Sequence, residues 1–219
     1  MFSKIKISVM ALVPMAACAS LNAHAGSAEL SVIGNISPSA CTLTLSANGI
    51  VDYGKIDVSS LSDTAPTPLD LKPMNFTVNC DASTSVAMIV KDNRTSSKIP
   101  GLIGVNVDDK DIFGLGTANG KKIGGYTLSL GGLKGNGKIV SGGQSADGES
   151  WSNIGVYLTG DGSTMYSWRE GSVSATPPGS FKSVAGELRV HAIINKTSQL
   201  DLTQKISLDG SATIELKYL

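Results

Sequence analysis

The chain has 219 residues, and its 18 Lys and Arg balance its 18 Asp and Glu, so the formal net charge is zero. Without a basic cluster, this balance argues against an electrostatic surface for nucleic acid or for an anionic membrane. Apolar residues make up 41% of the chain, and the length suits one domain with a sizeable core.

The first 25 residues are predicted to be a secretory signal peptide. Lys4 and Lys6 precede an apolar run over residues 7–19, and Ala23-His24-Ala25 is a small-residue cleavage signal. The apolar run is too short for a comfortable transmembrane helix. An alternative interpretation makes Cys18 the lipid-modified first residue of a lipoprotein. Cleavage after residue 25 would leave 16 basic and 18 acidic residues, a net charge of −2.

An alternating segment opens the predicted mature chain, which begins GSAELSVIGNISPSAC (26–41). Its alternate positions are Ala28, Leu30, Val32, Gly34 and Ile36. A period of two residues is typical of a β-strand. Two interpretations are open: this strand pairs within its own chain, or it pairs with another chain.

Two cysteines, Cys41 and Cys80, remain once Cys18 is removed. In an exported chain they are predicted to form a disulfide that closes a loop of about 40 residues and stabilises the fold by about 4 kcal/mol. The alternative is a pair of unpaired buried thiols. A metal site is not expected, because two Cys need further ligands and His191 is the one His of the mature chain.

Strand-like stretches separated by turn residues fill the remainder of the chain. Strands are predicted at 74–80, 86–90, 126–130, 154–158, 188–194 and 211–219. Asn48-Gly49 predicts a two-residue hairpin between CTLTLS and IVDYGKI. With no helical pattern, the predicted class is all-β, an antiparallel β-sandwich. The 12 glycines of residues 114–148 indicate either a flexible insertion or a set of tight hairpin turns.

Signals for catalytic chemistry are weak. GLKGNGKI (132–139) resembles a phosphate-binding loop, but Ile139 replaces the required Ser or Thr and no helix is predicted to follow. His191 is expected to face outward from a strand, and the acidic DDKD (108–111) is expected to be a solvated loop. We therefore expect no enzyme activity, no catalytic residue, no cofactor and no metal.

Three aromatic residues form a candidate contact for a glycan: Trp151, Tyr166 and Trp168. Aromatic rings can stack on the apolar faces of sugars. The alternative is that they are ordinary core or edge aromatics.

The last nine residues, SATIELKYL (211–219), alternate like the first segment. Ala212, Ile214, Leu216 and Tyr218 share one face of the predicted strand. Both ends of the predicted mature chain are therefore strand-like, and the penultimate residue is aromatic.

Taken in order, these elements resemble a subunit of the chaperone–usher pili, or fimbriae. The matching elements are the signal peptide, ELSVIGNI, SAC at Cys41, VDYGKI, MNFTVNC at Cys80, and SATIELKYL. The middle, about 100–185, is longer and richer in Gly than in a shaft subunit, and it looks closer to a group of fimbrial-like proteins.

The resemblance implies an incomplete immunoglobulin-like sandwich (37–219) that lacks its last strand and is completed by a donated one. A periplasmic chaperone would first supply that strand beside Ala212–Tyr218. The donor-strand extension (26–36) of a neighbouring pilus subunit would then replace it by β-augmentation. An outer-membrane usher would be the third partner, and the protein would move from the periplasm to the cell surface.

Three functions follow as hypotheses. The first is a structural subunit of a surface filament that serves cell adhesion. The second is a minor or tip adhesin that binds a host glycan or surface. The third is a soluble periplasmic β-sandwich protein that does not polymerise, or an enzyme that uses His191.

Overall fold

A computed structural model describes residues 29–34, 40–104, 107–171 and 177–219. Its contacts divide the chain into residues 1–37 and residues 38–219. The described residues form β-strands and short 3₁₀ turns, which confirms the predicted all-β class. Within this part of the chain, no helix has the length and apolar character needed to cross a membrane.

The first sheet has the strand order β1-β3-β13-β8-β5, with β2 beside β13 and β9 beside β8. All of its pairings are antiparallel. Its strands are β1 (Cys41–Leu45), β2 (Thr67–Pro68), β3 (Lys72–Thr84), β5 (Phe113–Gly114), β8 (Gly124–Gly135), β9 (Lys138–Ile139) and β13 (Phe181–Ile194).

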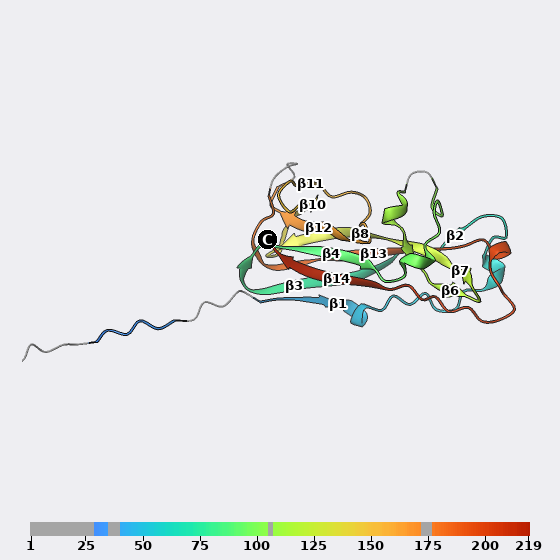
Figure 1. Cartoon of the computed structure of the whole chain (residues 1–219), viewed down its shortest axis with the longest axis horizontal. Coiled ribbons are helices and arrows are strands. Elements are labelled where there is room, and N and C mark those ends of the chain that lie inside the picture. Colours follow the sequence, from blue (N-terminus) through green and yellow to red (C-terminus); the bar gives the residue numbers. More distant parts are fainter. Residues whose placement is uncertain (1–28, 35–39, 105–106, 172–176) are drawn as a thin grey trace, which may run out of the picture. The chain divides into compact units, whose positions relative to one another are not determined.

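The second sheet has the order β11-β10-β12-β4-β14, and its pairings are also antiparallel. Its strands are β4 (Val86–Asp92), β10 (Ser141–Ser145), β11 (Ser152–Asn153), β12 (Asp161–Arg169) and β14 (Ala212–Tyr218). A small hairpin joins β6 (Thr117–Ala118) to β7 (Lys121–Lys122). Figure 1 shows the long strands of both sheets running in similar directions.

The core lies between the two sheets. Met74, Phe76, Val78 and Cys80 are buried on one face of β3, as their alternation predicts. Phe76 of the first sheet meets Trp168 of the second, with 6.3 Å between the ring centroids. The two sheets therefore pack face to face as a sandwich.

The Gly-rich residues 114–148 belong to this sandwich, since they supply β8, β9 and β10 together with the short hairpin β6–β7. The alternative of a flexible insertion is wrong for this segment. The phosphate-loop motif is the β8–β9 hairpin, and its turn has Asn136 and Gly137 at φ values of +49° and +80°.

Two local predictions are wrong. Positive φ values at Ala47, Asn48 and Gly49 do turn the chain, but the residues that follow do not pair with β1. Instead, β1 pairs with β3, and the next segment crosses β13, where the Tyr53 hydroxyl donates to the Val190 carbonyl (3.1 Å).

The predicted strand at 154–158 is absent from the described structure. The Ile154 N–H donates to Gly142 in the second sheet, whereas the Leu158 N–H donates to Leu128 in the first. Because its two ends bond to different sheets, the segment connects the second sheet to the first and does not extend either one, and Val156 is left 75% exposed.

Candidate functional site

Two edge strands, one from each sheet, define the site. β1 ends the first sheet and β14 ends the second, so within the described residues each has a strand partner on one side only. An edge strand presents unpaired N–H and C=O groups to any further strand. The edges of β1 and β14 can therefore accept another strand, as can the opposite edges of the two sheets at β5 and β11.

The pairing of β1 with β3 shows which backbone groups face the open edge. Cys41 lies opposite Cys80 with a Cα–Cα distance of 4.0 Å, and their disulfide confirms the predicted link. So short a distance indicates a non-hydrogen-bonded pair of an antiparallel ladder. Such pairs recur at every second residue, so the N–H and C=O groups of Leu43 and Leu45 also point away from β3 and toward the edge.

One hydrogen bond joins the two edges. The Cys41 N–H donates to the Tyr218 hydroxyl at 2.9 Å. Tyr218 thus finds the polar partner expected for its hydroxyl, although its side chain stays 50% exposed. This bond joins the start of β1 to the end of β14.

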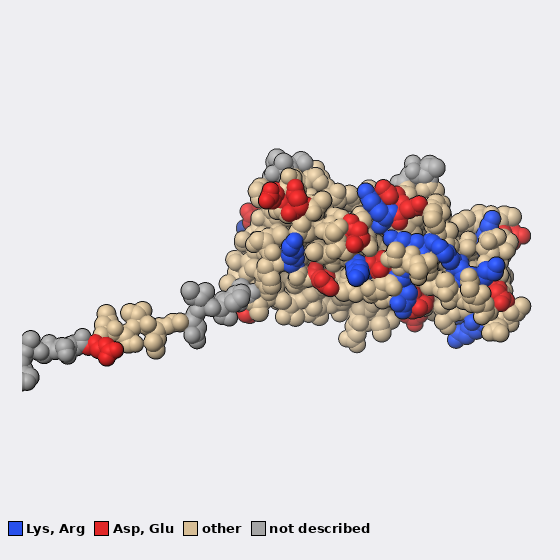
Figure 2. Space-filling model, viewed as in Figure 1, with Lys and Arg blue, Asp and Glu red and all other residues tan. Residues whose placement is uncertain are grey.

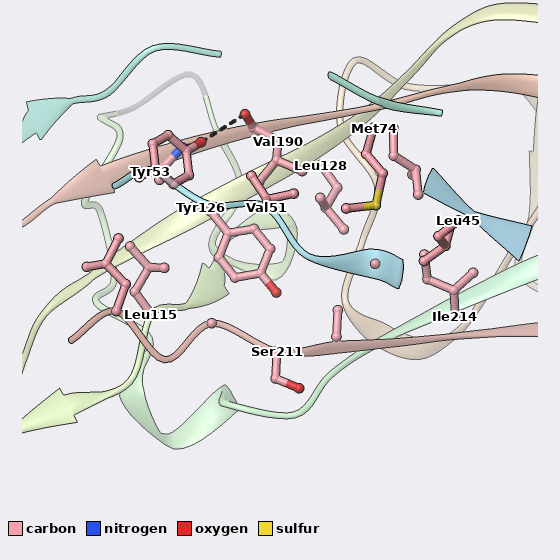
Figure 3. A pocket seen from close by; sticks show the side chains of 16 residues that line it. Leu45, Val51, Tyr53, Met74, Leu115, Tyr126, Leu128, Val190, Ser211 and Ile214 are labelled. Carbon is pink, nitrogen blue, oxygen red and sulfur yellow. Dashed lines mark hydrogen bonds between the residues drawn. The ribbon is translucent and has the colours of Figure 1, made fainter. Parts of the chain in front are cut away.

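An apolar groove of about 290 Å³ lies farther along the two edges. One rim follows β1 and the chain after it, and the other runs through residues 208–214 (Figure 3). The inner face of the first sheet forms the floor. The lining residues are Leu45, Gly49, Val51, Tyr53, Met74, Leu115, Tyr126, Leu128, Leu188, Val190, Ala192, Leu208, Gly210, Ser211, Ala212 and Ile214.

Two tyrosines bring polar atoms to the groove. The Tyr53 hydroxyl is engaged on β13, where it accepts from the Ala192 N–H at 3.2 Å. Tyr126 stacks on Phe113 with 5.1 Å between ring centroids, and burial raises the pKa of its hydroxyl well above the usual value. Both hydroxyls are therefore neutral at physiological pH, and the groove suits an uncharged occupant.

A charged clamp holds the start of β14. The Arg94 guanidinium donates to both carboxylate oxygens of Asp209 at 2.8 Å and to the Asp209 carbonyl at 3.1 Å. These bonds lower the pKa of the Asp209 carboxyl. Asn93 adds hydrogen bonds from its side-chain amide to Ser211 and Thr213. The turn after β4 thus fixes the rim on which Gly210 and Ala212 lie.

A wider cleft of about 730 Å³ lies next to the groove. Segments 51–61 and 200–208 form its sides, and Ile194 of β13 and Ile123, which directly precedes β8, also line it. Val51, Tyr53 and Leu208 line both hollows, so the two lie next to each other.

Of the four side chains predicted to form the rim at 211–219, two line the groove itself. Ala212 and Ile214 line the groove, and Leu216 packs against the core beside them. Sequence reasoning missed Val51, Tyr53, Leu115 and Tyr126, which come from segments far apart in the chain. The alternation of Val51 and Tyr53 after Gly49 was the one signal that could have indicated two of them.

The predicted donor segment is described in part. Leu30 and Val32 are 88% and 89% exposed, and residues 29–34 form neither helix nor strand. Gly34 also lies in this stretch, whereas Ala28 and Ile36 lie outside the described residues. The role of the segment remains a prediction.

The proposed glycan contact is wrong for the three aromatic residues. Trp151, Tyr166 and Trp168 are only 7%, 0% and 1% exposed. The Trp151 indole N–H donates to the Gly148 carbonyl, and the Tyr166 hydroxyl accepts from the Thr159 N–H. Their rings belong to the interior, so they offer no face to a sugar.

The other candidate sites have structural explanations. In the acidic segment 108–111, Asp109 accepts from the Gly101 N–H and Asp111 from the Thr159 hydroxyl. Among the described residues, no group of three or more potential ligands is placed to hold a metal. His191 is half-buried on β13 opposite Thr127.

Comparisons with known proteins locate the chain among relatives. A family model described as "Protein of unknown function (DUF1120)" matches residues 30–127. Protein GltF of Escherichia coli K12 is 30% identical over 95% of this chain and 98% of its own. The uncharacterized protein YhcF of the same strain is 27% identical over 82% of this chain and 85% of its own.

Among solved structures, a chain from a chaperone–usher pilus aligns with 89% of this chain and 96% of its own, at 14% identity and a TM-score of 0.42. The likeness to GltF extends over nearly the full length of both proteins. The chain therefore belongs to the family of protein GltF.

Proposed function

We propose that this protein is a structural subunit of a bacterial surface filament, a pilus or fimbria, in which residues 26–36 of one copy fill the groove of the next. One observation carries the proposal: an apolar groove lies between two open sheet edges, in a chain that also has an exposed, alternating apolar segment. The two surfaces differ, so the contact is heterologous and extends into a filament.

The donor segment suits the groove in both polarity and spacing. Alternate side chains of an extended segment point to the same face, which would direct Leu30, Val32 and Ile36 toward the floor. Burying these three at about 1.5–3 kcal/mol each would contribute about 5–9 kcal/mol before the cost of ordering. The edge groups of Leu43 and Leu45 would add main-chain hydrogen bonds.

The partners and location belong to the same proposal. A periplasmic chaperone would cover the groove before assembly, and an outer-membrane usher would bring subunits together at the cell surface, where the filament serves adhesion. The Cys41–Cys80 disulfide supports export, because such bonds persist in oxidising compartments. The burial of the three aromatic rings removes one of the two observations that favoured a glycan-binding tip subunit, the other being the longer middle of the chain.

The test is gel electrophoresis in SDS of surface-sheared material, unheated and boiled, from cells that carry the chaperone and usher genes. We expect a ladder that collapses to one band on boiling and that is lost when residues 26–36 are deleted. Neighbouring substitutions give a matched pair: Leu30→Asp should abolish the ladder, whereas Ser31→Asp on the opposite face should preserve it. A ladder that survives the deletion, or a single monomer band from the unaltered protein, would overturn the proposal.

A further inference from the structure

One hydroxyl of the groove has no hydrogen-bond partner. Of the described residues that line the groove, three carry a polar side chain: Tyr53, Tyr126 and Ser211. The Tyr53 hydroxyl bonds to two main-chain groups of β13, and the Ser211 hydroxyl accepts from the Asn93 side-chain amide. The Tyr126 hydroxyl makes no hydrogen bond with any described residue.

The Tyr126 side chain is nonetheless buried. The residue is 6% exposed, and Figure 3 shows its oxygen pointing into the open part of the groove. A buried donor without an acceptor destabilises the state that contains it, unless water or a ligand supplies the acceptor. A strand that fills the groove displaces water, so it must itself offer an acceptor to Tyr126.

The register of the first sheet places Tyr126 beyond the end of β1. Leu45, the last residue of β1, pairs with Phe76, and Phe76 pairs with Gly186 of β13. Tyr126 pairs with Ala192. Gly186 and Ala192 are six residues apart, which is about 20 Å at the rise of a strand. An occupant therefore has no ladder with β1 at the level of Tyr126, and its carbonyls there need another donor.

The opposite rim is tight at this level. A Cβ added to Gly210 would lie 3.0 Å from the Tyr126 ring, and β14 begins only at Ala212. The ring thus lies against the rim. An occupant residue that faces this ring must be small, so that its main chain can come close to the hydroxyl.

The donor segment has such a residue in Gly34. It shares the apolar face with Leu30 and Val32 but has no side chain. Its φ lies outside the left-handed region, and a Cβ added there would meet no described atom within 4 Å. The free chain therefore does not require a glycine at this position, whereas a close approach to Tyr126 would.

Charge agrees with this occupant. Charges of both signs are spread over the face shown in Figure 2, but none of the 16 residues that line the groove is charged. The donor segment 26–36 has one charged residue, Glu29, which alternates with the apolar face. An extended segment can therefore enter with its apolar face inward and leave Glu29 outside.

The hydrogen bond between the two edges sets the direction of entry. It joins the Cys41 N–H to the Tyr218 hydroxyl, so no strand can lie between the edges at that end. Residues 35–40, which lead to the neighbour's own sandwich, must then leave at the Tyr126 end. This direction puts Leu30 and Val32 deeper in the groove than Gly34.

We propose that the Tyr126 hydroxyl donates to a main-chain carbonyl at Gly34 of the neighbouring copy and thereby selects the strand and register that the groove accepts. This inference rests on the proposed function and adds a specificity-determining residue to it. A larger residue in place of Gly34 would hold the carbonyl away and leave the buried hydroxyl without an acceptor, which penalises the wrong strand.

A double-mutant cycle with the full exported chain tests the contact. Fluorescence polarisation measures the affinity of labelled peptides of residues 26–36 for the unaltered protein and for Tyr126→Phe. The variant should bind the unaltered peptide about threefold to tenfold more weakly, the range for one neutral hydrogen bond. A Gly34→Ala peptide should lose less than about twofold, because its carbonyl no longer reaches. A Ser31→Ala peptide, altered on the opposite face, should show the full loss.

A second measurement applies even where the Gly34→Ala peptide binds too weakly for the cycle. The NMR signal of a ¹³C-labelled Gly34 carbonyl in the bound peptide should move with Tyr126→Phe, whereas that of a labelled Leu30 carbonyl should not. The Tm of the empty protein should stay the same or rise, because the lost hydroxyl has no partner among the described residues.

The outcomes separate this contact from strand exchange itself. Equal binding of the unaltered peptide by both proteins, or an unmoved Gly34 signal, would overturn the inference and leave strand exchange in place. A loss that is the same for all three peptides would also overturn it, since it would indicate a structural role for Tyr126. No binding of the unaltered peptide by the unaltered protein would overturn both this inference and the proposed function.

Discussion

The Cys41–Cys80 disulfide should dominate the stability of the edge strand β1. β1 has five residues and pairs with β3 alone in the described structure, so the disulfide adds a covalent link to a short ladder and to the packing of Leu43 and Leu45 on the core. The two cysteines are 39 residues apart. For a loop of this length the chain-entropy relation gives about 4 kcal/mol at 25 °C. In a domain of this size that corresponds to a fall in Tm of about 8–16 °C.

The assay is thermal and urea unfolding of the Cys41→Ala/Cys80→Ala chain beside the unaltered protein. Dithiothreitol added to the unaltered protein serves as the control and should produce the same loss. A synthetic peptide of residues 26–36 should also bind more weakly to the altered chain, because a frayed β1 supplies fewer edge groups. A stability loss under about 1 kcal/mol would refute the reasoning, since it would mean that β1 is held by other contacts.

Three further predictions concern single side chains. Tyr218→Phe removes the acceptor of the Cys41 N–H, so amide exchange at Cys41 should accelerate; unchanged exchange in NMR would contradict the bond between the edges. Arg94 depresses the pKa of Asp209, so this carboxylate stabilises the fold above its unfolded pKa of about 3.9, and the contribution is lost as pH falls through the folded pKa. Asp209→Asn should therefore lower the Tm at pH 7, and the difference should vanish in strong acid; a difference that persists there would count against the clamp. Trp168→Ala should lower the free energy of unfolding by about 3–5 kcal/mol, because the ring is buried in the core. If the variant stayed folded and lost only an ability to bind sugar, this role in the core would be contradicted.

The strands of the core were predictable because local alternation and burial agree. Met74, Phe76 and Val78 alternate with polar residues and point inward as expected. The turn at Asn48-Gly49 was also predictable, but the strand pairing around it was not. β1 pairs with β3, to which the disulfide links it, and not with the residues that follow the turn. Pairing of distant segments is a tertiary property that a two-residue turn signal does not contain.

The site shows the same limit. Ala212 and Ile214 were identifiable as rim residues from the alternation of the last strand. Tyr126 was identifiable only as part of a strand, because its place in the groove depends on how β8, β13 and the chain after β1 lie together. The prediction that the aromatic residues contact a glycan was wrong for a related reason. A Trp such as Trp168 can stack on a ligand or fill a core, and only the packing of the folded chain decides between the two.

Hydrogen–deuterium exchange of the two edges, with and without excess peptide of residues 26–36, tests the central claim most directly. If the groove accepts this segment as a strand, amides in residues 43–45 and 212–216 should become protected, while the far edge at β11 should not change. A Leu30→Asp peptide should give no protection. Edges that exchange equally fast with and without the peptide would contradict the account.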